Sequence, residues 1–206
     1  MHNCGMKPPI LRSLYKPARL LRGFTLIELM VTIAVMVILA SLAAPALGTF
    51  VSRSTMRGMS ADFNLAFQRA RSEAINRNEC VAICMSDNAS SATPSCSASG
   101  SNWAVGWIVF RYPACTPTSG VAFTTPSSEN MVLAREGVTV RYRLNNIGGI
   151  DSVVFNARGV PRSGASKFNL LDNQAVANGP DDKFNRTFCL DFAGRLRTVE
   201  YLASCT

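Results

Sequence analysis

Two arginines near the end of the chain have a spacing that suits contact with phosphates. Arg195 and Arg197 follow Gly194, and residues 191–194 (Asp-Phe-Ala-Gly) have the composition of a hairpin turn in which glycine can take a positive φ. Residues two apart on a strand face the same side, so the two guanidiniums would lie roughly 7 Å apart. Held side by side, they could contact successive phosphates of a nucleic acid backbone.

A solvated strand edge would give the same pattern. Charged side chains on an edge strand discourage aggregation, and Arg141 and Arg143 form a second Arg-x-Arg pair in this chain. Other cations would widen a basic surface if the fold gathered them, namely Arg158, Arg162, Lys183 and Arg186. The pattern alone leaves the binding surface and the solvated edge both open.

The cysteines could form disulfides. One of the seven, Cys4, precedes residue 23, and the remaining six are an even set, which favours disulfides in a compartment outside the cytoplasm. Six cysteines allow 15 pairings. The loops that they bracket favour Cys84–Cys96 around a Ser/Ala-rich loop and Cys189–Cys205 around a terminal hairpin, which leaves Cys80–Cys115. A zinc site is the alternative, but paired C-x-x-C motifs are absent.

Enzymatic chemistry finds no support in the sequence. The only histidine is His2, so residues 24–206 can form neither Ser-His nor Cys-His nucleophile pairs. The G-x-S-x-G, phosphate-loop and H-E-x-x-H motifs are also absent. The adjacent acids at 181–182 fit a solvated turn better than a calcium site. We therefore expect no enzyme activity, no cofactor and no metal.

The beginning of the chain combines a basic segment with an apolar one. Residues 1–23 carry five cations and no acid, so they supply most of the formal charge of +8 and leave +3 for the rest. Residues 24–47 are apolar except for Glu28 and are long enough to span a bilayer as a helix. The charge asymmetry places the N-terminus in the cytoplasm and the residues after 47 outside it. A carboxylate inside a membrane span costs free energy, so the presence of Glu28 indicates a functional role.

Beyond this segment the chain predicts one domain. Apolar residues at three- and four-residue spacing within 54–78 extend the apolar segment into one helix over 24–78. From residue 79 the patterns are those of strands separated by Gly, Pro, Ser and Asn clusters. The expected strands are 80–85, 104–112, 131–135, 138–144, 152–157, 186–192 and 196–202. In 138–144, Val138, Val140, Tyr142 and Leu144 alternate with polar residues.

Gly23, Phe24 and Glu28, after a basic leader, resemble the cleavage and methylation site of type IV prepilins and type II secretion pseudopilins. The resemblance implies that residues 1–23 are removed, that Phe24 becomes the methylated N-terminus, and that Glu28 pairs with a neighbouring subunit's N-terminal amine during assembly. The alternatives are a secretory signal cleaved after Ala46, which has no use for Glu28, and a plain membrane anchor.

The whole layout resembles the FimT/GspH family of minor pilins and pseudopilins. The resemblance implies an α+β, type IV pilin-like fold: a long N-terminal helix packed on an antiparallel β domain over 79–206. In the FimT branch a Gly-Arg-x-Arg motif near the C-terminus contacts DNA during natural transformation. Gly194, Arg195 and Arg197 match that motif.

The hypothesis that follows is a minor type IV pilin that binds duplex DNA and assists its uptake. Its expected partners are other major and minor pilins, prepilin peptidase, DNA and, before assembly, the inner membrane. It would cross that membrane once with its C-terminus in the periplasm and then join a pilus at the cell surface. The alternatives are a GspH-like pseudopilin of type II secretion and a structural pilin that primes a pilus without binding DNA.

Overall fold

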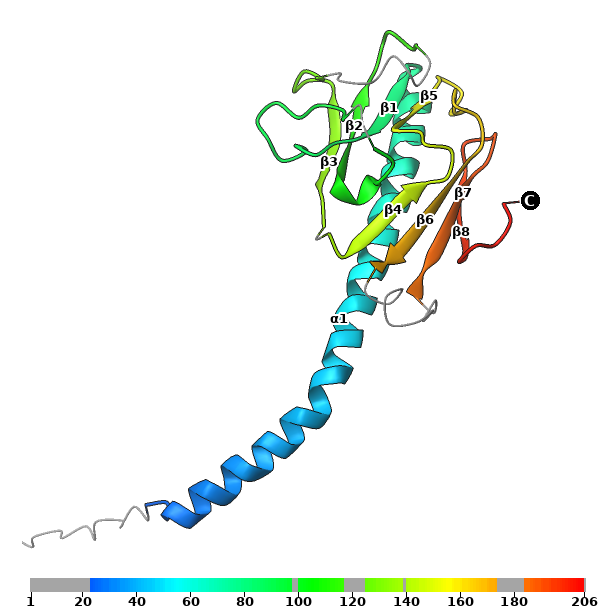
Figure 1. Cartoon of the computed structure of the whole chain (residues 1–206). Helices are drawn as coiled ribbons and strands as arrows, with labels where there is room; N and C mark the ends of the chain where they lie inside the picture. Colours follow the sequence, from blue (N-terminus) through cyan, green and yellow to red (C-terminus); the bar gives the residue numbers. More distant parts are fainter. Residues whose placement is uncertain (1–22, 98–99, 117–124, 139, 174–183, 206) are drawn as a thin grey trace, which may run out of the picture. The chain divides into compact units, whose positions relative to one another are not determined.

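The computed structural model describes residues 23–97, 100–116, 125–138, 140–173 and 184–205. These residues form a long helix, α1 (Leu26–Arg77), a short 3₁₀ helix, η1 (Trp103–Val105), and eight strands. The strands are β1 (Val81–Met85), β2 (Gly106–Arg111), β3 (Met131–Glu136), β4 (Tyr142–Asn146), β5 (Ser152–Phe155), β6 (Ser166–Asp172), β7 (Arg186–Leu190) and β8 (Leu196–Glu200) (Figure 1). The chain divides into two compact units, Met1–Ala46 and Leu47–Thr206.

The first unit contains the start of α1. The backbone N–H of Glu28 donates to the hydroxyl of Thr25 at 3.2 Å, so Thr25 caps the helix and Glu28 stands in its first turn. The 18 residues Leu26–Ala43 have a mean hydropathy of 2.5, enough in length and composition to cross a membrane. Their side chains are exposed, Leu26 by 77%. An apolar surface of this extent requires lipid or other protein to cover it.

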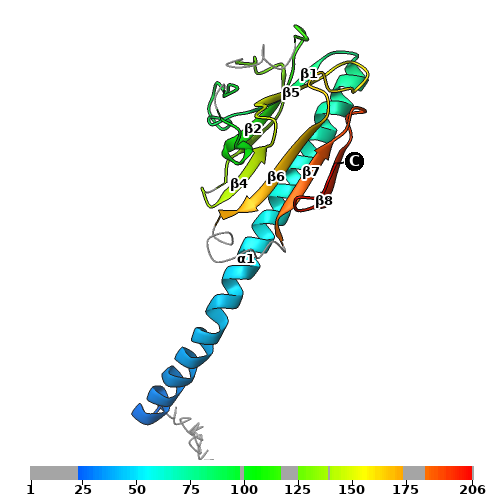
Figure 2. The same ribbon diagram turned by 45° about the vertical axis from the view of Figure 1, so that its right-hand side comes forward.

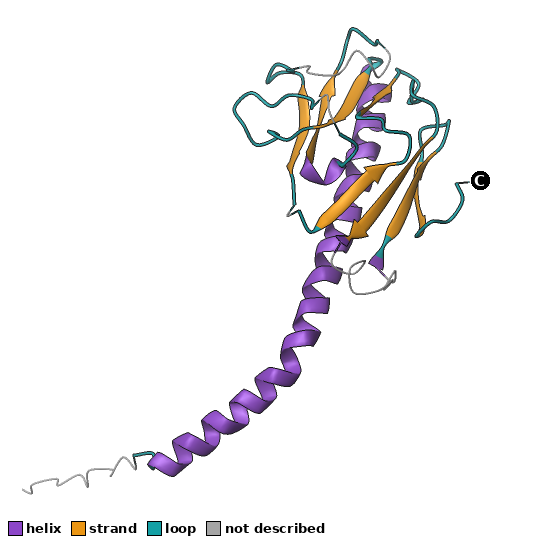
Figure 3. Cartoon of the chain, in the orientation of Figure 1, coloured by secondary structure: helices purple, strands orange, loops and turns teal. Residues whose placement is uncertain are grey.

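The second unit packs two sheets against the part of α1 that belongs to it. One sheet has the strand order β3-β2-β1-β5 and the other β4-β6-β7-β8, and every pair of these strands is antiparallel. Figure 2 shows β6, β7 and β8 running along α1, and Figure 3 separates helix from strand by colour. The described residues therefore confirm the predicted α+β class.

An aromatic cluster centred on Phe63 of α1 forms the core of this unit. The rings of Trp103, Trp107, Phe168 and Phe188 lie 5.1–5.8 Å from the Phe63 ring, centroid to centroid. All five side chains are fully buried. The cluster draws on α1, η1, β2, β6 and β7, so it joins both sheets to the helix. Aromatic side chains bury large apolar areas, so this cluster stabilises the packing of α1 against both sheets.

One expected strand needs correction, and one observed strand was not expected. The strand expected over 138–144 begins only at Tyr142. Val140 is 93% exposed and does not face the core, whereas the half-buried Val138 packs against it. Strand β6 was missed because its Lys167 and Asn169 have low strand propensity. The structure explains Asn169: its Oδ1 accepts a hydrogen bond from the Thr187 hydroxyl of β7 at 2.9 Å.

The six cysteines of the second unit are joined as Cys80–Cys115, Cys84–Cys96 and Cys189–Cys205. These are the three pairs that were predicted from the loops between the cysteines. The first two link β1 to loops at its two ends. The third ties the tail after β8 back to β7, next to the hairpin that carries the candidate arginines.

Candidate functional site

The candidate arginines lie on the hairpin formed by β7 and β8. The register pairs Cys189 with Arg197 and Leu190 with Leu196, so the turn spans residues 191–195. In this turn the N–H of Gly194 donates to the Asp191 carbonyl at 3.0 Å, and Gly194 has a φ of +77°. The composition of residues 191–194 thus predicted the turn and its positive φ correctly. β8 is the edge strand of its sheet, and both Arg195 and Arg197 are exposed.

Gly194 is buried and works as a support for the turn. A Cβ at this position would overlap the carbonyl oxygen of Gly159 and would lie 3.2 Å from the Phe155 ring. The turn therefore needs glycine twice, for its positive φ and for the close approach of the segment that carries Gly159. The buried Gly194 positions the turn directly before Arg195, and its part in DNA binding, which the motif implies, stays a prediction.

Arg195 is held by the carboxylate at the start of the turn. Asp191 accepts the Arg195 backbone N–H at 2.8 Å and the Arg195 Nε–H at 2.9 Å. Burial raises the pKa of Asp191, but the hydrogen bonds and the charge of Arg195 outweigh it and leave that pKa below its usual range. The Arg195 side chain is still 68% exposed, so its guanidinium is oriented and remains accessible.

Arg195 and Arg197 line a groove between β8 and α1 with a volume of about 610 Å³. From α1 it is lined by Gln68, Arg71, Ser72 and Ile75. Arg71 donates from Nε to the Gly159 carbonyl at 3.3 Å, which brings a third guanidinium to the groove. Neither Arg71 nor Arg197 forms an ion pair with any residue that the structure describes. The groove therefore combines three arginines with one carboxylate, Asp191, beside it.

The other predicted cations are not gathered here. Arg158 and Arg162 are exposed on the segment that carries Gly159, and neither lines the groove. Arg186 opens β7 opposite Glu200, at the other end of the hairpin. Lys183 and the acids at 181–182 lie outside the described residues.

The second Arg-x-Arg pair differs from the first. Arg141 is bound by Asp172, with Nη2 and Oδ2 at 2.7 Å, so its guanidinium is already occupied.

Two residues at this end of the hairpin were missed from the sequence. Arg71 looked like an ordinary polar position of a helix, and only the packing of α1 beside β8 brings it to the groove. The exposure of Phe192 was missed: the sequence assigned this residue both to the predicted turn 191–194 and to the end of the expected strand 186–192. The structure ends β7 at Leu190 and leaves Phe192 75% exposed in the turn. With Lys167 and Arg197 it lines a second hollow of about 250 Å³.

Residues 60–194 match the family model described as Type II transport protein GspH, and residues 21–44 match the prokaryotic N-terminal methylation motif. The chain belongs to the GspH family. This GspH-family chain is also similar to the type IV minor pilin FimU of Pseudomonas aeruginosa PAO1 in two crystal forms. One match has 15% identity, a TM-score of 0.52 and covers 76% of this chain and 99% of FimU. The other has 16% identity, a TM-score of 0.49 and covers 73% and 99%. No curated protein matches the sequence.

Family membership establishes the broad role of the chain. It is a minor type IV pilin or pseudopilin, a class of structural subunits that assemble with other pilin-like proteins. The methylation motif includes Gly23, Phe24 and Glu28 and implies processing by a prepilin peptidase. Among the described residues no group of three or more His, Cys, Asp or Glu side chains could hold a metal. The GspH match ends at Gly194, immediately before the two arginines.

Proposed function

We propose that this chain is a minor type IV pilin that binds duplex DNA non-specifically through Arg195 and Arg197 and so assists DNA uptake in natural transformation. The supporting observation is the groove beside β8, where these two arginines meet Arg71 and where, among the described residues, no carboxylate lines the groove and Asp191 pairs with Arg195. Guanidiniums match the geometry of phosphate oxygens, and contacts to phosphates carry no sequence information.

The geometry of the hairpin favours binding over a purely structural role. Asp191 fixes the direction of Arg195, which reduces the conformational entropy that the side chain loses when it binds. Arg197 is exposed and is paired with no described carboxylate, so no ion pair has to break before it contacts a phosphate. An edge that served only to prevent aggregation would need neither the fixed orientation nor the third arginine from α1.

The test is a salt titration of DNA binding by the mature full-length chain in nonionic detergent. Binding of a 30-base-pair duplex is followed by fluorescence anisotropy between 50 and 200 mM salt. Each phosphate contact contributes about 0.9 to the slope of log K against log salt, so Arg195→Ala with Arg197→Ala should lower the slope by about 2. The ratio of the wild-type binding constant to that of the variant should then fall roughly tenfold over this salt range.

The matched control removes two arginines elsewhere. Arg69→Ala with Arg143→Ala deletes the same charge from exposed positions that line no groove described above. This control variant should keep the wild-type slope. Equal slopes for the wild type, the Arg195/Arg197 variant and the control would show that the hairpin makes no phosphate contacts, and the proposal would be abandoned.

The proposed route to the pilus starts in the inner membrane. The span Leu26–Ala43 would cross it once, with the second unit in the periplasm, until prepilin peptidase removes residues 1–23 and Phe24 is methylated. Glu28 would then pair with the N-terminal amine of a neighbouring subunit. Mass spectrometry of the mature protein should find N-methylated Phe24 at its start. A mature N-terminus near residue 47 would point instead to a cleaved secretory signal.

A second candidate function is a pseudopilin of type II secretion, which the description of the matched family favours. In that case the arginines form a solvated edge and the chain is part of a secretion piston. A deletion strain separates the two: loss of transformation with normal protein secretion supports the pilin, and the reverse supports the pseudopilin. Loss of piliation with unchanged DNA binding by the purified chain would indicate a subunit that only primes the filament.

A further inference from the structure

Phe192 is an aromatic side chain that the turn between β7 and β8 holds out into solvent. It is 75% exposed, whereas the phenylalanines within β2, β5, β6 and β7 are fully buried. One edge of its ring lies beside Gly164, where an added Cβ would come within 3.5 Å of a ring carbon. A single exposed apolar residue carries no meaning by itself. This ring, however, stands beside the arginines of the proposed binding site, and its surroundings decide what it can bind.

Two cations lie beside the ring. Lys167, Arg197 and Phe192 line the hollow of about 250 Å³, together with Cys189 and Cys205 of the last disulfide. The strand register pairs Cys189 with both Lys167 and Arg197, so the two cations stand in one row across β6, β7 and β8, with Cα atoms roughly 10 Å apart. Arg197 also lines the groove beside α1 and so borders both spaces. A nucleotide whose phosphate contacts Arg197 therefore has the Phe192 ring within its reach.

The other polar groups of the hollow are held in place. Lys167 Nζ donates to the Ala203 carbonyl at 2.9 Å, and an ammonium has three N–H groups, so it keeps donors for a second partner. The carboxylate of Asp191 also lines the hollow but accepts the Arg195 Nε–H at 2.9 Å. Contact with a base needs an open aromatic ring and one nearby guanidinium, and it does not need an excess of positive charge in the hollow.

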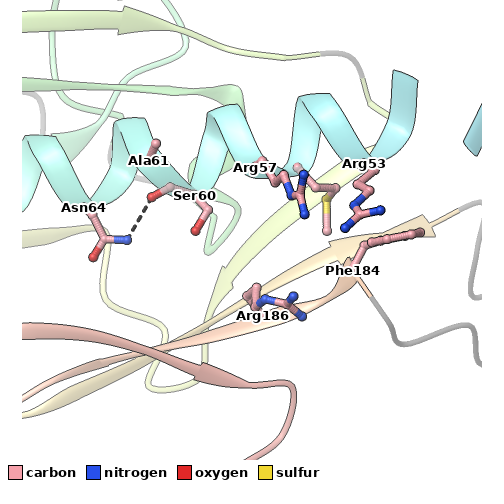
Figure 4. A pocket seen from close by; sticks show the side chains of 8 residues that line it. Arg53, Arg57, Ser60, Ala61, Asn64, Phe184 and Arg186 are labelled. Atoms are coloured by element: carbon pink, nitrogen blue, oxygen red, sulfur yellow. Dashed lines mark hydrogen bonds between the residues drawn. The ribbon is translucent and has the colours of Figure 1, made fainter. Parts of the chain in front are cut away.

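The aromatic side chain at the other end of the hairpin is already covered. Phe184 is half-buried, and the guanidinium carbon of Arg53 lies 5.5 Å from the centre of its ring, within cation–π distance. Figure 4 shows Arg53 beside Phe184, in a groove that Arg57 and Arg186 also line. Among the described residues no guanidinium or ammonium lies over the Phe192 ring in this way. Phe192 therefore has a free face, and Phe184 does not.

We propose that Phe192 stacks on an unpaired base of DNA whose phosphate contacts Arg197, so that the hairpin binds single-stranded ends of DNA as well as duplex. This inference rests on the proposed function and adds a base contact to the same site. Proteins that bind single strands without sequence preference combine cations for the backbone with aromatic rings for the bases. Arg197 and Phe192 line one hollow and supply both kinds of contact. A base inside a duplex is stacked between its neighbours and cannot reach the ring.

The experiment compares two DNA probes with the mature full-length chain in nonionic detergent. Both probes carry an unpaired tail of about five nucleotides at one end of the duplex used above, and in the second probe the tail is abasic. The two tails have the same phosphates, so only contact with the bases distinguishes them. Fluorescence anisotropy should show that the wild type binds the base-bearing tail about 5- to 150-fold more tightly, the strength of one stacked base.

Two variants of Phe192 test whether the ring makes this contact. Phe192→Leu keeps an apolar side chain but removes the aromatic face, so it should abolish the preference for the base-bearing tail, whereas Phe192→Tyr should retain it. Phe192 is exposed, so both variants should fold, and the fluorescence of the buried Trp103 and Trp107 checks this. Stacking releases no counterions, so Phe192→Leu should change the affinity for the tail without changing the salt slope.

The outcomes separate this inference from the proposed function. If the wild type binds both tails equally while the Arg195/Arg197 variant loses slope on the blunt duplex, the base contact is wrong and the hairpin proposal stands. If there is neither a tail preference nor a loss of slope, both are wrong. A preference that persists in Phe192→Leu places the base elsewhere and overturns the inference. Equal binding of both tails, combined with defective pilus assembly in a Phe192→Leu mutant, would assign the ring to a neighbouring subunit, which also overturns it.

Discussion

Replacement of Gly194 by alanine should destabilise the second unit far more than replacement of another glycine with a similar backbone. Gly194 and Gly149 have φ values of +77° and +71°, and a Cβ at Gly149 would meet no atom within 4 Å. Gly149→Ala therefore carries only the cost of a left-handed alanine, about 1–2 kcal/mol. At Gly194 the new Cβ must also displace the carbonyl of Gly159, and overpacking of this kind costs roughly another 1–3 kcal/mol.

The comparison uses urea unfolding of the full chain in nonionic detergent. Trp103 and Trp107, the chain's two tryptophans, are fully buried in the second unit, so their fluorescence follows the unfolding of that unit alone. Gly194→Ala should lower the free energy of unfolding by about 2–5 kcal/mol and Gly149→Ala by about 1–2 kcal/mol. Equal losses for the two variants would refute the close approach of Gly159 and with it the positioning role of Gly194.

Three further predictions concern stability. Asp191→Asn should lower the free energy of unfolding at pH 7. The difference between wild type and variant should vanish as the pH falls through the folded-state pKa of Asp191, because a depressed carboxyl pKa contributes stability only while the group is ionised. Urea titrations at several pH values check this, and a difference that does not shrink with falling pH argues against it. Cys189→Ala with Cys205→Ala should lower the free energy of unfolding by about 3 kcal/mol, because it opens a loop with a separation of 16 residues. Chemical unfolding with and without reductant measures this loss, and reductant should destabilise the variant less than the wild type, because the variant lacks this disulfide. Phe63→Ala should cost about 3–5 kcal/mol by leaving a cavity in the aromatic cluster, and a melting temperature close to the wild type would contradict that cluster.

Much of the fold could be predicted from local patterns. The helix was expected over 24–78 and is observed as Leu26–Arg77, and the turn before Arg195 was expected from its composition. These succeeded because helix periodicity and turn chemistry are properties of short segments. Strand β6 was not predicted, and the expected start of the strand 138–144 was wrong, for the opposite reason. Whether a short segment becomes a strand depends on the neighbour that it pairs with.

The candidate site shows the same division. Arg195 and Arg197 could be recognised as a pair because two residues on one strand have a predictable spacing. Arg71 could not be assigned, since a helix sequence does not say which strand will lie beside it. The exposure of Phe192 was missed because the expected strand 186–192 ran into the turn, and the end of β7 at Leu190 is set by pairing with β8.

The sequence by itself determined where the methylation motif lies, which segment is apolar enough to enter a membrane, and which two arginines lie two residues apart beside a turn. Each of these depends on residues within a few positions of one another, so local chemistry suffices. Only the tertiary structure decided that Gly194 is buried against Gly159 and that α1 contributes arginines at both ends of the hairpin. Those contacts join residues that are 35 to 133 positions apart in the chain. Their formation depends on the packing of the helix and both sheets around the aromatic core, which no local pattern encodes.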